Sequence, residues 1–322
     1  MSELPFVTVV IPCYKRPGPL RKAIESVFAQ DYPRDRFELI VVDSSPDTDN
    51  AEISKELEPK ATCAYRFIHL DVARGPGISR NTGAAAGRGS WIAFMDSDCF
   101  AAPGWLRNSI AAIEDGVGLV QGKTLPDPEG KPGVFTWCPE TLSENVVYEC
   151  TNILYRREAF EQAGGFPADL TPDNTRPLGG EDMMMGWGVK RLGWRSNFAP
   201  QSIVYHEVAP MPKWLWFADF RLLLWPEVVA RFPEMRSRLY GRYFWDRAQA
   251  LLTLAFLGAG LAFVSPWFLA LAGPYLYLRC SPRSKSFPGP LRPLRAVPWI
   301  VRDTAFMIIL LVGSVRARAL LI

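Results

Sequence analysis

The stretch Trp91–Cys99, WIAFMDSDC, decides the fold of this chain. Its first five residues are apolar, aromatic or small, as in a strand that is buried on both faces of a sheet. Asp96, Ser97 and Asp98 follow at once. A buried strand that ends in two carboxylates places negative charge at the carboxyl edge of a sheet, which is where open α/β sheets bind their ligands.

The two carboxylates of this stretch repel each other unless a cation lies between them. Because the ligands are oxygens, the expected cation is hard and divalent, either Mg2+ or Mn2+. The alternative is a polar turn that caps the next helix, since Asp and Ser are frequent turn and N-cap residues. The neighbouring motifs favour the cation site.

The composition of the 322-residue chain argues against several classes of protein. The net charge of +3 disfavours nucleic acid as the main partner. The six cysteines form no C-x-x-C pair and the only histidines are His69 and His206, so a Cys/His zinc site is not expected. Scattered single cysteines indicate a reducing compartment. The first apolar run, Phe6–Ile11, lacks the charge order of a signal peptide.

Strands and helices are expected to alternate along the first part of the chain, which predicts a doubly wound, mostly parallel α/β sheet with helices on both faces. The predicted strands are Phe6–Ile11, Phe37–Val42, Tyr65–Leu70 and 91–95, and the predicted helices between them are Leu20–Phe28, Asn50–Leu57 and Ile78–Ala86.

A further acid, Asp43, ends the second predicted strand. Because the carboxyl ends of parallel strands meet at one edge, Asp43 is expected to lie near Asp96 and Asp98, an arrangement that suits a nucleotide and its metal. Asp43 would accept a hydrogen bond from a base N–H or a ribose hydroxyl. The alternative is an Asx-turn with Ser45 or Asp47.

The segment Arg74–Asn81, RGPGISRN, supplies positive charge at the start of a predicted helix. Arg74 and Arg80 flank its Gly-Pro-Gly turn, and arginines together with helix-terminal N–H groups suit a diphosphate. The alternative is a surface loop with solvated arginines. No G-x-x-x-x-G-K-[ST] motif is present, and no G-x-G-x-x-G follows the first strand, which disfavours P-loop and Rossmann dinucleotide sites.

Three blocks of sequence together resemble family 2 glycosyltransferases of the GT-A fold: VTVVIPCYKRPGPLRKAIESVFAQDYP, FELIVVDSSPD and GPGISRNTGAAAGRGSWIAFMDSDC. The resemblance implies that Pro12 and Tyr14 border the nucleotide and that Asp43 contacts the base. It also implies that Asp96 and Asp98 are the D-x-D motif, which holds a divalent cation on the diphosphate of a UDP- or GDP-sugar.

One position departs from the family pattern. The family often has a second acid directly after the acid of the second strand, and this chain has Ser44. How the base and ribose are held therefore stays open. The residues expected to bind the donor are Pro12, Tyr14, Arg16, Asp43, Arg74, Gly77, Arg80 and Asp96.

A second acidic pair, Glu181 and Asp182, begins the helical stretch GGEDMMMGWGVKRLGW, which resembles the family's E-D segment. The resemblance implies that Asp182 is the general base, with Glu181 beside it. The alternative is that two acids in a first helical turn complement the helix dipole. His206 follows the predicted strand Ser202–Tyr205, and the resemblance implies that it joins the metal or the diphosphate. The alternative is a structural histidine.

The chain changes character after residue 210 and becomes rich in Trp, Phe, Leu and Arg. Pro212–Trp225 suits a helix in a membrane interface, or a buried helix. Ala248–Leu278 is expected to be a broken helical hairpin that enters a membrane and returns. Thr304–Val315 is expected to lie at the surface or cross partly. Basic residues flank the hairpin and place both of its ends on the cytoplasmic side; those behind it are Arg279, Arg283, Lys285, Arg292 and Arg295.

The expected organisation is a catalytic domain over residues 1–210, amphipathic interfacial helices over 211–247 and a hydrophobic membrane region over 248–322. The resemblance implies an inverting glycosyltransferase at the cell membrane, with its catalytic domain on the cytoplasmic side, that acts on a lipid-linked or glycan acceptor. The Q-x-x-R-W signature of processive synthases is absent, so one sugar is expected per event. A sugar nucleotidyltransferase is disfavoured because IPCYKRPG lacks its glycine- and arginine-rich loop. A non-catalytic membrane scaffold is disfavoured by the two acidic pairs.

Overall fold

The computed structural model describes residues 4–133, 135–167, 179–280 and 296–322. The chain divides into two compact units, the first made of Met1–Pro132 and Trp137–Ala209 and the second of Gly133–Thr136 and Pro210–Ile322. Part of the predicted basic flank lies outside the described residues, namely Arg283, Lys285, Arg292 and Arg295.

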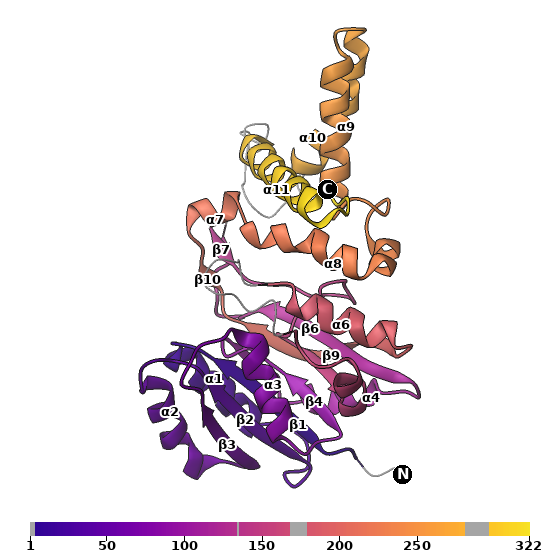
Figure 1. The fold of residues 1–322 in the computed structure, drawn as a ribbon. Coiled ribbons are helices and arrows are strands. Elements are labelled where there is room, and N and C mark those ends of the chain that lie inside the picture. The colour runs from indigo at the N-terminus through magenta and orange to yellow at the C-terminus, as the bar shows by residue number, and fades with distance from the viewer. Residues whose placement is uncertain (1–3, 134, 168–178, 281–295) are drawn as a thin grey trace. The chain divides into compact units, whose positions relative to one another are not determined.

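The first unit is built on an eight-stranded sheet with the strand order β3-β2-β1-β4-β8-β6-β9-β5 (Figure 1). Its strands are β1 (Val7–Cys13), β2 (Phe37–Asp43), β3 (Ala64–His69), β4 (Trp91–Phe94), β5 (Cys99–Ala101), β6 (Val117–Pro126), β8 (Ile153–Arg156) and β9 (Arg195–His206). Its helices are α1 (Pro17–Phe28), α2 (Asp49–Leu57), α3 (Pro76–Ala86), α4 (Trp105–Ala111), α5 (Arg157–Gln162) and α6 (Glu181–Arg191), with a 3-10 turn η1 at Glu58–Lys60.

The sheet is parallel in one half and mixed in the other. Strands β1 to β4 pair in parallel, as the alternating pattern predicts. Strand β8 is antiparallel to both β4 and β6, and β5 is antiparallel to β9, whereas β6 and β9 are parallel. The result is a mixed, mostly parallel sheet.

Helices cover both faces of β1, which explains why its residues are almost all apolar. Val9 and Ile11 pack with Leu20 of α1 in one core cluster. On the opposite face, Gly83 of α3 approaches Val10 so closely that an added Cβ would lie 2.4 Å from the Val10 Cγ1. Glycine at this position therefore sets how near α3 can approach the sheet.

Strand β9 is longer than the predicted strand Ser202–Tyr205. Its first residues, Arg195, Ser196 and Asn197, are polar and only partly covered. Because that half of the strand lacks an apolar alternation, the sequence gives no strand signal there.

The second unit is helical: α7 (Lys213–Phe217), α8 (Trp225–Arg231), α9 (Arg247–Leu261), α10 (Gly273–Cys280) and α11 (Ala296–Ala317), with 3-10 segments η3 (Phe220–Leu224), η4 (Pro233–Arg238) and η5 (Pro266–Ala272). Two short strands, β7 (Thr136–Trp137) and β10 (Ala209–Pro210), complete the described elements. Among the described residues, one helix, Val297–Ala317, is long and apolar enough to cross a membrane by length and composition.

The predicted helix over Pro212–Trp225 is wrong as a single element, because the segment is split into α7, η3 and the start of α8. Asp219 begins a new turn, and its side chain accepts a hydrogen bond from the backbone N–H of Arg221. An acid that caps the following turn in this way competes with helix continuation.

Candidate active site

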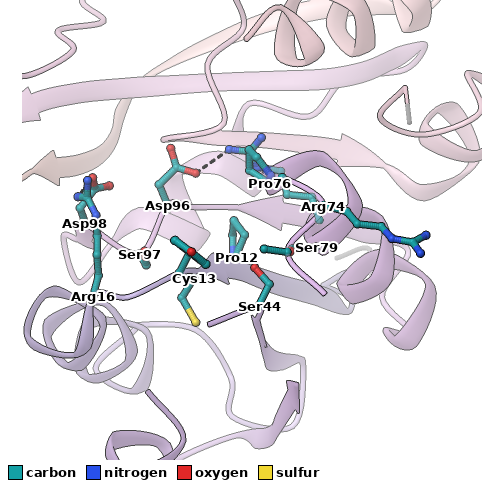
Figure 2. Close-up of a pocket in the computed structure, with 14 residues that line it drawn as sticks. Pro12, Cys13, Arg16, Ser44, Arg74, Pro76, Ser79, Asp96, Ser97 and Asp98 are labelled. Atoms are coloured by element: carbon teal, nitrogen blue, oxygen red, sulfur yellow. Dashed lines mark hydrogen bonds and ion pairs between the residues drawn. The ribbon is translucent and has the colours of Figure 1, made fainter. Parts of the chain in front are cut away.

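A cavity of about 540 Å³ opens at the carboxyl edge of β1, β2 and β4 (Figure 2). The turn that precedes α3 forms one wall, where Gly75 adopts a positive φ of 83°. Most of the predicted site residues line this cavity, namely Pro12, Tyr14, Arg16, Arg74, Arg80, Asp96 and Asp98. The sheet thus brings together residues that lie far apart in the sequence.

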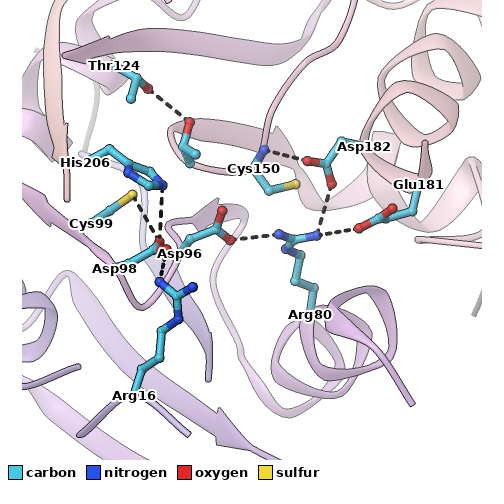
Figure 3. Close-up of polar contacts among 11 residues, drawn as sticks. Arg16, Arg80, Asp96, Asp98, Cys99, Thr124, Cys150, Glu181, Asp182 and His206 are labelled. Atoms are coloured by element: carbon cyan, nitrogen blue, oxygen red, sulfur yellow. Dashed lines mark hydrogen bonds and ion pairs between the residues drawn. The ribbon is translucent and has the colours of Figure 1, made fainter. Parts of the chain in front are cut away.

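The two acids of the D-x-D segment have different partners (Figure 3). Asp96 accepts a hydrogen bond from Arg80 at 2.7 Å. Asp98 forms an ion pair with Arg16 and lies 3.4 Å from the Nε2 atom of His206. Arg80 therefore holds Asp96, and Arg16 holds Asp98.

Arg80 links Asp96 to the second acidic pair. Its Nη1 atom lies 3.0 Å from Asp182 and 3.4 Å from Glu181. The guanidinium is 4% exposed and lies 5.4 Å from the centre of the Phe166 ring. Its Nε atom has no hydrogen-bond partner within the described parts of the chain. One arginine on α3 thus joins the end of β4 to the start of α6.

The charge at this junction is unbalanced, because three carboxylates surround one guanidinium. Burial, followed by the charge of Asp182, raises the pKa of Glu181 to about 7. Burial also raises the pKa of Asp182, and the nearby Arg80 opposes this shift. The backbone N–H of Cys150 donates to Asp182 at 3.0 Å and fixes the second oxygen of its carboxylate. A buried carboxylate with a raised pKa is suited to accept a proton.

A group of residues that could hold a metal ion lies beside Asp98. Ligand atoms of Asp98, Cys99 and His206 lie within 4.8 Å of one another. The Nδ1 atom of His206 donates to the carbonyl oxygen of Glu207 at 2.6 Å, because a carbonyl oxygen only accepts. In a neutral imidazole the Nε2 lone pair then faces a carboxylate oxygen, and two acceptors this close favour a cation between them.

The donor set fits a hard divalent ion. Carboxylate oxygens and an imidazole nitrogen suit Mn2+, and carboxylates suit Mg2+. Burial, together with Asp96 and Asp98, raises the pKa of the Cys99 thiol well above its usual range. A hard divalent ion also prefers oxygen ligands to a thiol, so Asp98 and His206 are the better ligands of the three. Burial and the charge of Asp96 also raise the pKa of Asp98.

Asp43 is not among the residues that line the cavity. The side chain is fully buried and accepts hydrogen bonds from Ser45 Oγ at 2.7 Å and Asn50 Nδ2 at 2.9 Å. The backbone N–H of Ser45 also donates to it at 3.2 Å, which is the Asx-turn contact. Burial opposes ionisation, but the hydrogen bonds from Asn50 and Ser45 lower the pKa of Asp43 below its ordinary value. The adjacent Ser44 lines the cavity instead.

The sequence did not predict two of the contacts in this region. His69, which the sequence gave no reason to include, places its Nδ1 atom 3.1 Å from Asp43. The register of β2 and β3 pairs these two residues directly, so strand alignment was the signal that could have found the contact. The N–H of Cys150 on Asp182 had no sequence signal. Gly77 lies within α3 against Phe166, outside the cavity lining.

The comparison with known families decides the identity of this unit. Residues 8–135 match the model of glycosyl transferase family 2. The chain carries a family 2 glycosyltransferase domain. The matched region contains the D-x-D segment and Arg80, and the second acidic pair lies beyond it.

Relatives and a solved structure agree with this assignment. Glycosyltransferase AglE of Haloferax volcanii is 28% identical over 65% of this chain and 69% of its own length. The GalNAc(5)-diNAcBac-PP-undecaprenol beta-1,3-glucosyltransferase of Campylobacter jejuni is 28% identical over 39% of this chain and 40% of its own length. The mannosyltransferase PcManGT of Pyrobaculum calidifontis, solved with GDP-Man and Mn2+, shares the fold: the TM-score is 0.56, with 19% identity over 98% of this chain and 88% of that one.

Proposed function

We propose that this glycosyltransferase moves a sugar, with inversion, from a nucleotide-diphosphate sugar to a hydroxyl of a membrane-proximal or lipid-linked acceptor. The observation that carries the proposal is the link through Arg80. It joins the D-x-D segment at the cavity to the acidic pair on α6, so groups suited to a leaving diphosphate and to an attacking hydroxyl adjoin one another. Inversion is what the family resemblance implies for such an arrangement.

The cavity is proposed to bind the nucleotide diphosphate of a UDP- or GDP-sugar. Pro12, Tyr14 and Ser44 form the side near β1 and β2, where the nucleoside would lie. Arg16, Arg74 and the first turn of α3 offer positive charge to the diphosphate. A base contact by Asp43 would need the fully buried side chain to become accessible from the cavity.

Asp98, with Asp96 and His206, is proposed to hold Mn2+ or Mg2+. The bound ion would stabilise negative charge on the departing diphosphate. Arg16 and Arg80 now bind the carboxylates of Asp98 and Asp96, so each is placed to turn toward the phosphates when those carboxylates take another partner. The Mn2+ and GDP-Man named for the structural neighbour support this assignment.

Asp182 is proposed as the general base. Arg80 and the N–H of Cys150 hold one oxygen each, which fixes the orientation of the carboxylate. The base takes the proton of the acceptor hydroxyl as that oxygen attacks the anomeric carbon from the face opposite the leaving group. Glu181, whose pKa is about 7, is placed to share that proton.

The acceptor is proposed to be presented at the cytoplasmic face of the cell membrane, with one sugar added per event. Support comes from the apolar second unit and from the undecaprenol-linked substrate in the name of the Campylobacter relative.

The test is hydrolysis and transfer with a panel of UDP- and GDP-sugars in the presence of Mn2+. We expect Asp98→Ala to abolish both reactions and Asp182→Asn to reduce them at least 100-fold, an order of magnitude typical of general base removal. Asp35→Ala, which changes an exposed acid away from the cavity, is the matched control and should retain activity. Equal inactivity of the wild type and the variants with every donor would contradict the proposal.

A further inference from the structure

The second unit carries an apolar hairpin formed by α9 and η5. The far end of the hairpin is uncovered: Phe263 is 98% exposed, Trp267 86% and Val264 80%. Leu257 on α9 and Leu269 on η5 are also exposed. The two arms pack together, since a Cβ added to Gly258 would lie 2.5 Å from the carbonyl oxygen of Phe268. A cluster of exposed apolar side chains such as this one marks an interaction site.

The base of the hairpin is polar and is fastened to α11. Gln249 Nε2 in the first turn of α9 donates to the carbonyl oxygen of Asp303 at 3.3 Å. On the returning arm, Tyr275 and Arg279 donate to the Asp303 carboxylate at 2.7 and 2.8 Å. Thr253, one turn further along α9, contacts Met307 of α11. Helix α11 therefore contacts the first turns of α9. The apolar part of the hairpin extends beyond that contact.

Helix α11 crosses α9 instead of running alongside it (Figure 1). If the hairpin points along the membrane normal, α11 is inclined away from that normal. At that level Arg302 is packed 4.5 Å from the ring centre of Phe306 and 5.0 Å from that of Trp299. Arginine and tryptophan are typical of the boundary between headgroups and hydrocarbon.

Helix α11 also packs on charged segments of the same unit. Arg302 donates to the carbonyl oxygen of Trp216, and a Cβ added to Gly313 would lie 2.6 Å from the carbonyl oxygen of Leu223. The segments η3 and α8 that lie along α11 carry Arg221 and Glu227. A membrane-spanning α11 would draw these charges into hydrocarbon, where unpaired charges are costly.

We propose that the α9–η5 hairpin inserts into one leaflet of a lipid bilayer while α11 lies in the interface, so that neither element crosses the membrane. The length agrees, because the 15 residues of α9 span about 22 Å, against about 30 Å for the hydrocarbon core. Since the first turns of α9 lie at the polar base, the inserted part reaches one leaflet only. The inference rests on the proposed membrane location of the enzyme but not on its chemistry.

Depth measurements on the full-length chain test this arrangement. Single cysteines at Leu257, Val264, Ile308, Val315 and, as a control in the first unit, the exposed Val72 would carry an environment-sensitive fluorophore, with the six native cysteines replaced by serine or alanine. The chains are mixed with vesicles of phosphatidylcholine and phosphatidylglycerol. Quenchers attached deep in the acyl chain, quenchers attached at the headgroup and aqueous iodide then report three levels.

The expected result is deep quenching at positions 257 and 264, headgroup quenching at 308 and 315, and quenching by iodide alone at position 72. Deep quenching at 308 with iodide access at 264 would show that α11 spans and would overturn the proposal. Iodide access at every position would overturn it as well, because no insertion occurs. The quenching measurement uses no sugar donor. A chain that lacked transferase activity but inserted as proposed would therefore give the same quenching pattern.

A vesicle flotation assay gives an independent readout. Phe263→Asp combined with Trp267→Asp should weaken vesicle partitioning at least about tenfold, because a carboxylate in hydrocarbon is costly. The matched control is Val72→Asp, an exposed apolar residue of the first unit, which should leave partitioning unchanged. Equal partitioning of the double variant and the wild type would contradict insertion of the hairpin.

Discussion

Arg80 is the residue on which the geometry of the site depends most. It contacts Asp96, Glu181 and Asp182, which come from two different elements, and burial leaves it no water to replace a lost partner. A planar guanidinium can bind two carboxylates along separate edges, whereas an ammonium is a single point of charge. The charge and the shape of this side chain therefore have separable effects.

Replacement of Arg80 separates these two effects. We expect Arg80→Lys to keep the folded state but to lower kcat by about 100-fold, because a small misplacement of reacting groups has that effect. Arg80→Ala should lower kcat further, and free guanidinium ions should restore part of the activity by entering the vacated space.

The matched control for that experiment is Arg74→Ala, which removes the other arginine at the same turn. This change should raise the KM for the donor, with little effect on kcat and no response to guanidinium. If guanidinium fails to restore the activity of Arg80→Ala, and if that variant also has a lowered melting temperature, then Arg80 acts in folding alone.

The dependence of activity on pH reports the base. Asp182 acts only when it is deprotonated, and burial raises its pKa, so kcat/KM should fall as pH decreases through that raised value. Arg80 lowers the pKa of Asp182, so Arg80→Met should move the acid limb of the profile to higher pH. If the acid limb stays at the same pH in the variant, Arg80 does not control the pKa of Asp182.

Single residues could be predicted from the sequence only where a local pattern carried the information. Asp96 and Asp98 stand at the end of an apolar strand, so their place at the sheet edge was readable. The contact of Arg80 with Asp182 was not, since it depends on how α6 returns to the sheet over a separation of 102 positions. The burial of Asp43 depends in the same way on Asn50 and His69, which come from neighbouring elements.

At the scale of elements, α3 transmits the packing of the sheet to the site. Gly83 sets the distance between this helix and β1, and Arg80 lies one turn earlier on the same helix. We expect Gly83→Ala to destabilise the first unit by about 1–3 kcal/mol, the usual range for overpacking, and to reduce activity by displacing Arg80. Urea unfolding and donor hydrolysis measure the two effects.

The control at this scale is Gly18→Ala in α1, where an added Cβ meets no atom within 4 Å. This variant should keep its activity and lose less stability than Gly83→Ala, since its added Cβ meets no neighbouring atom. If both variants unfold at the same urea concentration as the wild type, the close approach of α3 is not what fixes its position.

Asp303 plays the corresponding part in the second unit. Asp303→Ala removes the acceptor shared by Tyr275 and Arg279 and leaves a partly buried arginine without its counterion. A loss of about 3–5 kcal/mol is expected for a broken buried pair. The measurement is limited proteolysis, which should cut α10 first. Asp246→Ala, which removes only the N-cap of α9, is the milder comparison and should cost about 1 kcal/mol.

Elements with a strong local pattern were the predictable ones. β1, β2 and β4 are largely apolar, and their order along the chain implied the parallel half of the sheet. The antiparallel half was not readable, because β8 is a strand of four residues that inserts between β4 and β6 from a distant part of the sequence. The split of 212–225 at Asp219 shows how one capping acid overrides an apolar pattern.

At the scale of the molecule, a catalytic unit and an apolar helical unit share one chain. If the second unit serves to bring the enzyme to its acceptor, the two reactions of the site should separate. Phe263→Asp with Trp267→Asp should leave Mn2+-dependent donor hydrolysis in solution unchanged. The same variant should lower sugar transfer into a total membrane lipid extract at least about tenfold, in line with its weaker partitioning.

The comparison variant for that assay is again Val72→Asp, which should retain both reactions. Equal loss of hydrolysis and transfer in the hairpin variant would mean that the second unit supports the catalytic unit structurally instead of locating it.

Acids distant in the sequence are proposed to act around one divalent ion and one sugar donor. Calorimetric titration of donor into the full-length chain, with and without Mn2+, tests this proposal most directly. We expect donor binding that strengthens with Mn2+ in the wild type. The Mn2+ dependence should be lost in Asp98→Ala and kept in Asp182→Asn, which should bind the donor but react far more slowly. Donor affinity that is independent of Mn2+ in the wild type, or equal in the wild type and Asp98→Ala, would contradict the proposal.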